Sequence, residues 1–394
     1  MEKETSSSEA AGSESVEALV GQVVAEPVRE TYWTRQEAES RKLGRLTVYL
    51  GSAPGVGKTY AMLSEGQRRK ARGADVVVGF VQTYGRPKTI EMTKGLEKAR
   101  GRILPYRGGQ FDEMNVEAII ERRPQVVLID ELAHTNIPGS RRAKRWEDVL
   151  DVLAEGINVI TTVNIQHVAS LNDVVAQTTG IRQQETVPDW VLDLADQIEL
   201  VDMSPYALRR RMVHGNVYPD PNKAELALRR FFTEENLTAL RELALMRVAN
   251  VVDRDLLEKW SKNKAPETRE RVMVCVDDGP RSEDLIRRGA RMAGRLGGDL
   301  LVLHVQTGHK DLSTEWAKRT QFLVRELGGE FHVQKAEDPV EEALAFASRQ
   351  KITQIVVGES PRSRWKELIG GSFVANLIRR ASEVDIHVIS QQER

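Results

Sequence analysis

Residues 46–59 read LTVYLGSAPGVGKT, an apolar run that passes through glycines into Lys58 and Thr59. This pattern predicts a β-strand, a phosphate-binding loop and the first turn of a helix, the unit that forms ATP and GTP sites. The glycines let the backbone N–H groups face phosphate oxygens, the lysine bridges phosphates and the threonine ligates Mg²⁺. The strict pattern has a glycine at position 52, whereas this chain has Ser52 there and Gly51 one residue earlier. An ordinary glycine turn before a helix is the alternative.

A second acidic segment suits the same chemistry. Residues 126–131 read VVLIDE, four apolar residues that end in Asp130 and Glu131. Asp130 is expected to hold Mg²⁺ through water, and Glu131 to polarise an attacking water or hydroxyl. The alternative is a strand that ends in a solvated acidic pair.

Two further strand ends are candidates for the same site, because the carboxyl edge of a parallel sheet gathers ligand-contacting groups. Arg86 follows the second strand in VQTYGR, and Asn164 lies in TTVNIQH after the strand expected to neighbour the acidic one. Asn164 is expected to sense the γ-phosphate, with a turn or cap role as its alternative. The same alternatives apply to Arg86.

The sequence therefore predicts a site for ATP and Mg²⁺. The predicted cofactor-binding residues are Gly51, Pro54, Gly55, Val56, Gly57, Lys58, Thr59, Tyr60, Arg86 and Asn164. Thr59 and Asp130 are the predicted metal ligands. Glu131 and Lys58 are the predicted catalytic residues.

The segment AHTNIPGSRRAKRWED follows the acidic strand and is expected to be a loop that ends at a basic helix start. His134 and Asn136 are candidates to touch substrate. The basic residues Arg141, Arg142, Lys144 and Arg145 are candidates to meet phosphate or an acidic partner. We favour the simpler interpretation that they form a solvated basic face.

Composition excludes several classes of protein. The 394 residues carry 57 basic and 58 acidic side chains, so the whole molecule has no field that favours nucleic acid. One cysteine, Cys275, lies in an apolar run and fits a buried structural thiol in a reducing compartment. The seven histidines lack metal-ligand spacing. No apolar stretch is long enough for a membrane helix, and the N-terminus is unlike a signal peptide. We expect a cytoplasmic chain.

The chain is long enough for two domains. Residues 1–24 are predicted to be a disordered acidic and Ser-rich tail. In residues 25–260, short β-branched runs alternate with helical ones, which favours a parallel sheet, and a helical extension follows from about residue 204. A charged stretch at 261–270 is the predicted linker. In residues 271–394, five strands alternate with four helices, as in a small doubly wound domain. The predicted fold class is α/β.

Five segments of the first domain closely resemble the cytoplasmic N-terminal domain of the KdpD potassium-responsive sensor kinases: GSAPGVGKTYAML, VVVGFVQTYGR, LIDELAHTNIPGSRRAKRWEDV, GINVITTVNIQHVASLNDVV and ETVPD. The resemblance covers residues 25–260 nearly without a gap. The following domain resembles the universal-stress-protein module that comes next in that family. An early glycine in the phosphate loop is the family's own form, so the resemblance implies a P-loop nucleotide site with Lys58, Thr59 and the Asp130-Glu131 pair.

The resemblance implies an ATP-binding regulatory module of a two-component system that controls potassium uptake. Full-length members continue into membrane helices and a histidine-kinase core, which this chain lacks up to Arg394. We therefore expect it to act on a separate or missing sensor histidine kinase or a potassium-transport partner, at the inner face of the membrane. It would be a short stand-alone member or a fragment. A P-loop enzyme with weak ATPase or protein-hydroxyl kinase activity is the alternative, and a homodimer is left open.

The second domain keeps only part of the nucleotide-binding motif of stress proteins. Gly358 and Gly371-Ser372 are present, but Pro361 replaces a glycine. A structural or docking module is the favoured interpretation. Asp277 and Asp278 occupy the turn where some family members bind cyclic-di-AMP, and two carboxylates there would repel a phosphodiester. Cyclic-di-AMP is not expected as a ligand.

Overall fold

The computed structural model describes residues 43–106, 108–218, 220–261, 270–279, 281–307, 312–359, 373–381 and 384–390. The predicted tail and nearly all of the predicted linker lie outside these residues. The described residues belong to two compact units, 43–261 and 270–390, each of which is described by itself. No helix in the described parts of the chain is both long and apolar enough to cross a membrane.

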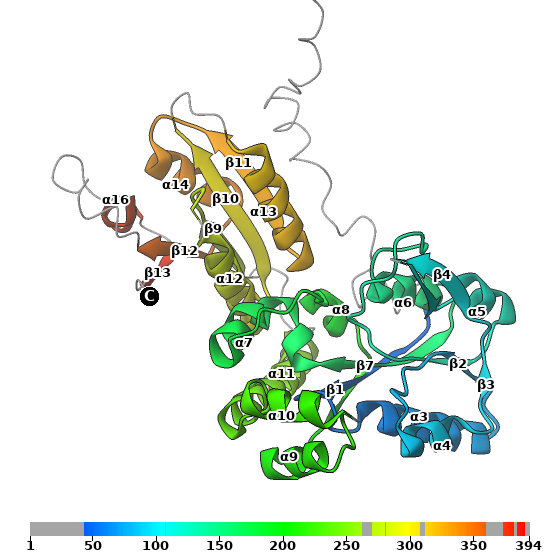
Figure 1. Cartoon of the computed structure of the whole chain (residues 1–394). Coiled ribbons are helices and arrows are strands. Elements are labelled where there is room, and N and C mark those ends of the chain that lie inside the picture. The colour runs from blue at the N-terminus through cyan, green and yellow to red at the C-terminus, as the bar shows by residue number, and fades with distance from the viewer. Residues whose placement is uncertain are drawn as a thin grey trace, which may run out of the picture. The chain divides into compact units, whose positions relative to one another are not determined.

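The first unit is built on a six-stranded sheet in which every neighbouring pair is parallel (Figure 1). Its order is β3-β2-β6-β7-β1-β8. The strands are β1 (Leu46–Gly51), β2 (Val76–Phe80), β3 (Glu97–Lys98), β6 (Val126–Ile129), β7 (Asn158–Asn164) and β8 (Gln197–Val201). All of them except β3 coincide with the short apolar runs from which the sequence predicts a parallel sheet, and the two-residue β3 is an addition. Because β7 lies between β1 and β6, its end separates the glycine-rich loop from the acidic pair.

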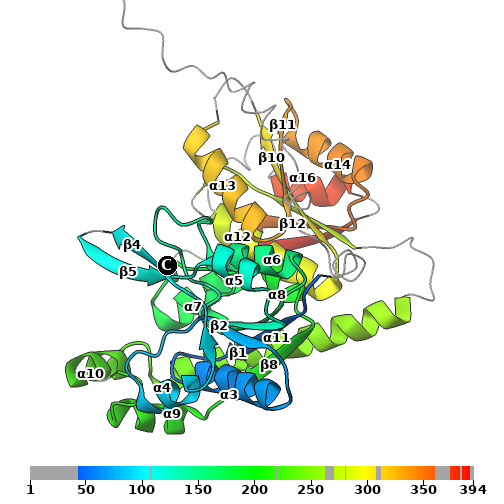
Figure 2. The same cartoon turned by 90° about the vertical axis from the view of Figure 1, so that its right-hand side faces the viewer.

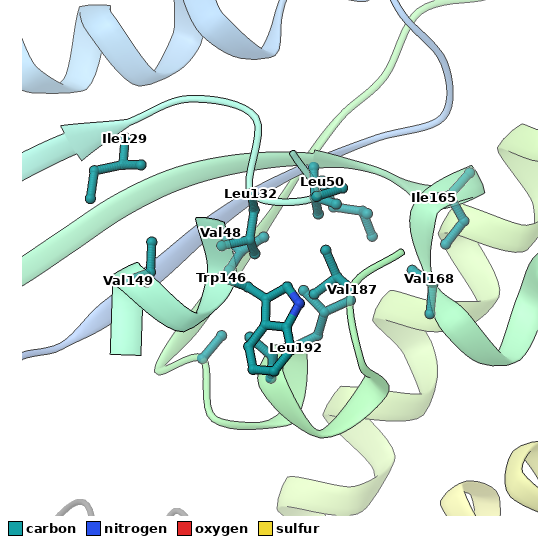
Figure 3. Packing of buried hydrophobic residues seen from close by; sticks show 14 of the residues in the cluster. Val48, Leu50, Ile129, Leu132, Trp146, Val149, Ile165, Val168, Val187 and Leu192 are labelled. Atoms are coloured by element: carbon teal, nitrogen blue, oxygen red, sulfur yellow. The ribbon is translucent and has the colours of Figure 1, made fainter. Parts of the chain in front are cut away.

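Alternating apolar side chains bury both faces of this sheet. On β1, Leu46, Val48 and Leu50 enter one core, whereas Tyr49 enters the core on the opposite face with Met62 of α3. The first core also receives helices α5, α6, α9 and α11, and Figure 3 shows its packing around Trp146. The helices are α3 (Lys58–Ala71), α4 (Pro87–Thr93), α5 (Val116–Arg122), α6 (Arg145–Ala154), α7 (Asn172–Thr179), α8 (Asp189–Asp193), α9 (Pro205–Val213), α10 (Pro221–Arg229) and α11 (Glu234–Ser261).

A small antiparallel hairpin was not predicted. It consists of β4 (Arg102–Tyr106) and β5 (Gly109–Glu113), which pair only with each other. Most of its side chains are exposed, including Ile103 at 66%, and only Glu113 is buried. A hairpin without a buried apolar face lacks the alternation by which strands are found in a sequence.

The second unit is a five-stranded parallel sheet in the order β11-β10-β9-β12-β13. Its strands are β9 (Arg271–Cys275), β10 (Asp299–Gln306), β11 (Glu330–Lys335), β12 (Gln354–Glu359) and β13 (Asp385–Ser390). The helices between them are α12 (Ser282–Leu296), α13 (Thr314–Glu326), α14 (Pro339–Arg349) and α16 (Phe373–Arg380). This order, with its switch at β9, is the doubly wound architecture that the sequence predicts. The partial glycine motif from position 360 to 372 lies outside the described residues.

Candidate functional site

The glycine-rich loop connects β1 to α3 and depends on its glycines in two different ways. Gly55 and Gly57 have φ angles of 89° and 109°, in the region that residues with a Cβ rarely adopt. Gly51 is needed for space instead, because a Cβ at this position would lie 2.7 Å from Cδ of Lys58. The early glycine therefore lets the Lys58 side chain lie directly against the end of β1.

Lys58 is a buried cation with neutral hydrogen-bond acceptors. Its side-chain nitrogen donates to Oδ1 of Asn164, at the end of β7, and lies 3.5 Å from the carbonyl oxygen of Ala53. Burial lowers the pKa of Lys58 to about 8, and the charge of Asp130 opposes this shift. A buried ammonium that has only neutral partners attracts an anion strongly.

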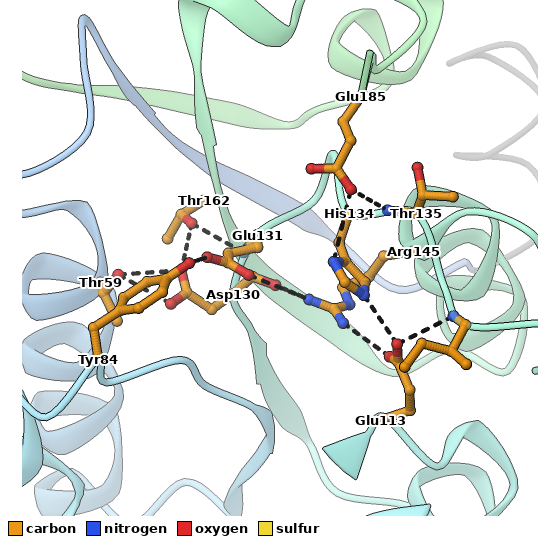
Figure 4. Close-up of polar contacts among 11 residues, drawn as sticks. Thr59, Tyr84, Glu113, Asp130, Glu131, His134, Thr135, Arg145, Thr162 and Glu185 are labelled. Atoms are coloured by element: carbon orange, nitrogen blue, oxygen red, sulfur yellow. Dashed lines mark hydrogen bonds and ion pairs between the residues drawn. The ribbon is translucent and has the colours of Figure 1, made fainter. Parts of the chain in front are cut away.

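Thr59 and Asp130 form the second part of the site (Figure 4). The Thr59 hydroxyl donates to the Asp130 carboxylate at 3.0 and 3.2 Å, although the two residues are far apart in the sequence. Asp130 is 1% exposed and also accepts from the hydroxyl of Thr162 on β7. Hydroxyl and carboxylate oxygens are the ligands that Mg²⁺ prefers. Thr162 belongs to the strand end that the sequence placed near the phosphates, but its contact with Asp130 depends on the pairing of β6 with β7 and could not be predicted.

Glu131 is held from two sides. The hydroxyl of Tyr84 donates to its Oε1, and Nη1 of Arg145 lies 3.9 Å from its Oε2. Burial raises the pKa of the Glu131 carboxyl, against the effect of the Tyr84 hydrogen bond. Glu131 and Tyr84 have φ angles of 59° and 50°, which are uncommon for residues with a side chain.

Arg145 corrects one sequence prediction. The solvated basic face is wrong for this residue, which is 0% exposed. Its guanidinium lies 3.1 Å from Glu113 of β5 and 3.8 Å from the ring centre of Phe80. At the first position of α6, its side chain extends under the end of β6 and donates to the Asp130 carbonyl oxygen. The positions of the basic residues in the sequence do not show that Arg145 is buried whereas the preceding basic residues reach solvent.

The neighbouring basic residues behave as predicted. Arg141 is exposed and Arg142 is half-buried, and both pair with Asp151. Lys144 donates to the hydroxyl of Thr135 at 2.9 Å. These contacts are those of a solvated face.

His134 and Asn136 are occupied by contacts inside the unit. Nε2 of His134 lies 2.9 Å from the Glu113 carboxylate, and the Asn136 amide donates to Asp148 at 2.6 Å. Burial raises the pKa of Asp148 to about 7. Both residues therefore support the loop after β6, whereas the sequence named them as candidates for substrate contact.

The remaining predicted residues are distributed around the loop. Arg86 donates to the Val217 carbonyl oxygen at 3.1 Å and lies over the Tyr84 ring. Val56 is 3% exposed and belongs to the core, so only its backbone can face a ligand. Pro54 is half-buried in the loop. Tyr60 is 47% exposed on the first turn of α3, and the described residues provide no contact that brings it to the site.

These residues fit a nucleoside triphosphate with Mg²⁺. The loop has two positive-φ glycines and leads into a helix N-terminus, where N–H groups and the helix dipole favour anions. Nε of Arg86 is buried without a hydrogen-bond partner, as a donor awaiting an acceptor would be. The Thr59-Asp130 pair has a hydroxyl and a carboxylate oxygen of the kind that would hold Mg²⁺.

Comparison with protein families gives two matches. Residues 42–252 match the family described as "Osmosensitive K+ channel His kinase sensor domain". Residues 268–389 match the universal stress protein family. Among solved structures, the universal stress protein from Archaeoglobus fulgidus is 26% identical, covers 31% of this chain and 92% of its own, and has a TM-score of 0.25.

Three curated relatives span both units. A sensor protein KdpD of Mycobacterium tuberculosis is 47% identical over 90% of this chain and 42% of the relative. A putative sensor protein KdpD of Synechocystis is 44% identical over 88% of this chain and 94% of the relative. The sensor protein KdpD of Escherichia coli strain K12 is 41% identical over 89% of this chain and 40% of the relative. The chain thus spans about two fifths of the mycobacterial and Escherichia coli relatives, and nearly all of the Synechocystis one.

Proposed function

The chain belongs to the KdpD family of sensor proteins, and we propose that its first unit binds ATP with Mg²⁺ and reports nucleotide occupancy to a histidine-kinase core that controls potassium uptake. One observation carries the proposal: Lys58 is buried with neutral acceptors next to the Thr59-Asp130 pair, at the end of a glycine-rich loop. The family description, a sensor domain for a potassium-channel histidine kinase, supports the signalling role. We place the module in the cytoplasm, at the membrane surface through its partner.

The roles follow from the geometry. Lys58 and the loop amides hold phosphate oxygens, and Thr59 and Asp130 supply metal ligands. Mg²⁺, when bound, neutralises part of the phosphate charge. Asn164 orients the Lys58 ammonium and marks the position where a γ-phosphate would meet β7. Since Glu131 is tied to Tyr84 and faces Arg145, it is not free to orient water, which favours a switch that responds to occupancy.

Calorimetry of MgATP binding tests the proposal. Lys58→Ala removes the buried cation, and we expect ATP affinity to fall by roughly 100-fold or more, in line with a charged hydrogen bond lost in a buried site. Lys70→Ala on the exposed face of the same helix is the matched control, with affinity unchanged. Equal affinity of the Lys58→Ala variant and the unaltered protein would rule out this site. Asp130→Asn should remove the Mg²⁺ dependence and leave weak, metal-free binding.

A second candidate is slow ATP hydrolysis through Glu131. The raised pKa of its carboxyl is the observation that favours it, because a carboxylate with a higher pKa is a stronger general base. The Glu131→Gln substitution separates the two functions.

For the second unit we propose a docking role without cyclic-di-AMP. The Asp277 carboxylate occupies the turn after β9, where it accepts hydrogen bonds from the Gly279 amide at 3.0 Å and the Ser282 hydroxyl at 3.1 Å. These donors would otherwise be available to a phosphodiester. Micromolar binding of cyclic-di-AMP to the full chain, measured by calorimetry, would contradict this part of the proposal.

A further inference from the structure

The segment that follows β8 packs against the glycine-rich loop. Val217 is 2% exposed, and its Cγ2 lies 2.7 Å from where a Cβ would stand on Gly55. Nη1 of Arg211, on α9, is the nearest atom to the corresponding position on Gly57, at 4.0 Å. The loop is therefore in contact with residues more than 150 positions downstream, and its glycines leave room for them.

Buried residues fix the position of α9 in the first unit. The packing of this helix therefore determines that Arg211 lies next to the loop. Leu208 and Met212 are 1% and 0% exposed in the core of the first unit. Arg211 lies three residues after Leu208, whose Cδ1 is also next to Gly55, and residues three apart share a helix face. Figure 2 shows α9 beside α10, and Arg209 donates to the Leu228 carbonyl oxygen of α10 at 3.2 Å.

Three cations thus lie around the loop and none of them forms an ion pair with another described residue, although the Asp130 charge acts on Lys58 and Arg86 from a greater distance. Within the described part of the chain, no carboxylate oxygen lies within 4.0 Å of the side-chain nitrogens of Lys58, Arg86 or Arg211. Lys58 and Arg86 donate to neutral oxygens only. The charge of Arg211 adds to the burial that lowers the pKa of Arg86, so the two guanidinium groups repel each other. Like charges gathered around buried N–H groups are unfavourable until an anion neutralises them.

We propose that Arg211 binds a phosphate of the nucleotide, together with Lys58 and Arg86, and that α9 is thereby the element that senses a polyphosphate in the loop. This inference rests on the proposed ATP site and adds a residue that no motif of the sequence indicates. The ligand chemistry is a nucleoside polyphosphate, because its successive phosphate groups can meet Lys58, Arg86 and Arg211 at the same time, whereas one phosphate group cannot. The affinity for adenosine monophosphate should therefore depend little on Arg211.

Calorimetry on the full chain with MgATP tests the inference. We expect Arg211→Ala to weaken MgATP binding by roughly 10-fold or more, and Arg211→Lys to restore part of the loss. Arg210→Ala is the matched control: this residue is exposed on the same turn, and its substitution should change affinity by less than about 2-fold. A low-salt titration should show the largest difference, because the contact is electrostatic.

A melting experiment without ligand excludes a merely structural role. Because Arg211 adds repulsion and makes no ion pair in the described residues, the ligand-free Arg211→Ala protein should melt at the same or a higher temperature. Two outcomes would overturn the inference: unchanged MgATP affinity of the Arg211→Ala variant, or weaker binding together with a lower melting temperature of its ligand-free form. Either outcome leaves the proposed ATP site intact if Lys58→Ala still loses MgATP binding. If the unaltered protein does not bind MgATP at all, the proposed function fails first, and this inference with it.

Discussion

Gly51 has the most specific role of any glycine in the loop. It lies one position before the place that the strict pattern gives it, and the structure supplies the reason, since the Lys58 side chain occupies the space of its absent Cβ. In the strict pattern the glycine at position 52 allows the backbone to turn. Here Ser52 occupies that position and is 3% exposed, and the Lys58 side chain lies against the end of β1 at Gly51. A departure from a motif can thus be a packing requirement.

Gly51→Ala should displace the Lys58 side chain. An overpacked core position costs about 1–3 kcal/mol, so we expect a loss of that size in the free energy of unfolding and a weaker MgATP affinity. Urea denaturation and calorimetry measure the two effects. Gly294→Ala on α12, where a Cβ meets nothing within 4 Å, should instead be neutral or stabilising by up to about 1 kcal/mol. Equal behaviour of the two variants would show that the Gly51 contact has no effect.

Proton uptake reports the charge of Lys58. Burial lowers its pKa from 10.5 to about 8, so above that pH the lysine of the free site is largely neutral. A bound polyphosphate favours the charged form and raises this pKa, hence MgATP binding should take up a proton at about pH 9 and none at about pH 7. Affinity should decline as pH rises through 8. Titrations in buffers of different ionisation enthalpy measure the uptake, and Lys58→Arg, which stays charged, should abolish it.

Glu131→Gln distinguishes a switch from an enzyme. It removes the charge of the carboxylate next to Asp130 and keeps its size, so we expect MgATP affinity to stay equal or to rise slightly. If ATP is hydrolysed with Glu131 as the base, phosphate release should fall by about 100-fold or more. We expect the control of the histidine-kinase core to survive in this variant. Loss of control with binding intact would favour turnover as the signal.

At the scale of elements, α6 connects the acidic strand to the hairpin. Its first residue, Arg145, contacts Glu113 of β5 and the Asp130 carbonyl oxygen of the acidic strand end. The hairpin is therefore anchored at its buried end and exposed elsewhere. The sequence could predict that a helix begins near this position, because basic and turn residues precede an apolar period. It could not predict that its first arginine lies inside, because that depends on a glutamate in a strand without alternation.

Arg145→Leu should destabilise the first unit. It removes the guanidinium from the carboxylate of Glu113, which is 4% exposed and keeps, among the described residues, only its contacts with His134 and the Ile137 N–H, and breaking a buried ion pair costs up to about 3–5 kcal/mol. Arg141→Leu, at a surface ion pair, should cost less than about 1 kcal/mol. The double variant Arg145→Leu with Glu113→Leu should recover part of the loss. Urea denaturation measures all three, and similar midpoints for Arg145→Leu and Arg141→Leu would contradict the buried-pair argument.

At the scale of the whole molecule, the chain holds two compact units that each have a core. One is centred on β1 and β7, the other on β9 and β10. Units with separate cores generally unfold separately. A ligand that binds only one native unit raises the stability of that unit by mass action.

Differential scanning calorimetry should therefore show two unfolding transitions, of which MgATP shifts only the one that belongs to the first unit. At a ligand concentration about 100 times the dissociation constant, the stabilisation should be about 2.7 kcal/mol. Lys58→Ala should abolish the shift and identify the transition. A single transition, or a shift of both, would show that the units unfold together.

The sequence by itself determined what is encoded locally: the glycine-rich loop, the acidic strand end, the alternation of strands and helices, and the class of both units. These depend on residue types within a few positions of one another, where backbone preferences and side-chain periodicity act directly. Only the tertiary structure decided which distant groups meet. Thr162 bonds Asp130 because β7 pairs with β6, Tyr84 reaches Glu131 across the sheet edge, and Arg211 reaches the loop because α9 is packed by Leu208. Strand order and core packing set these contacts, and no spacing along the chain records them.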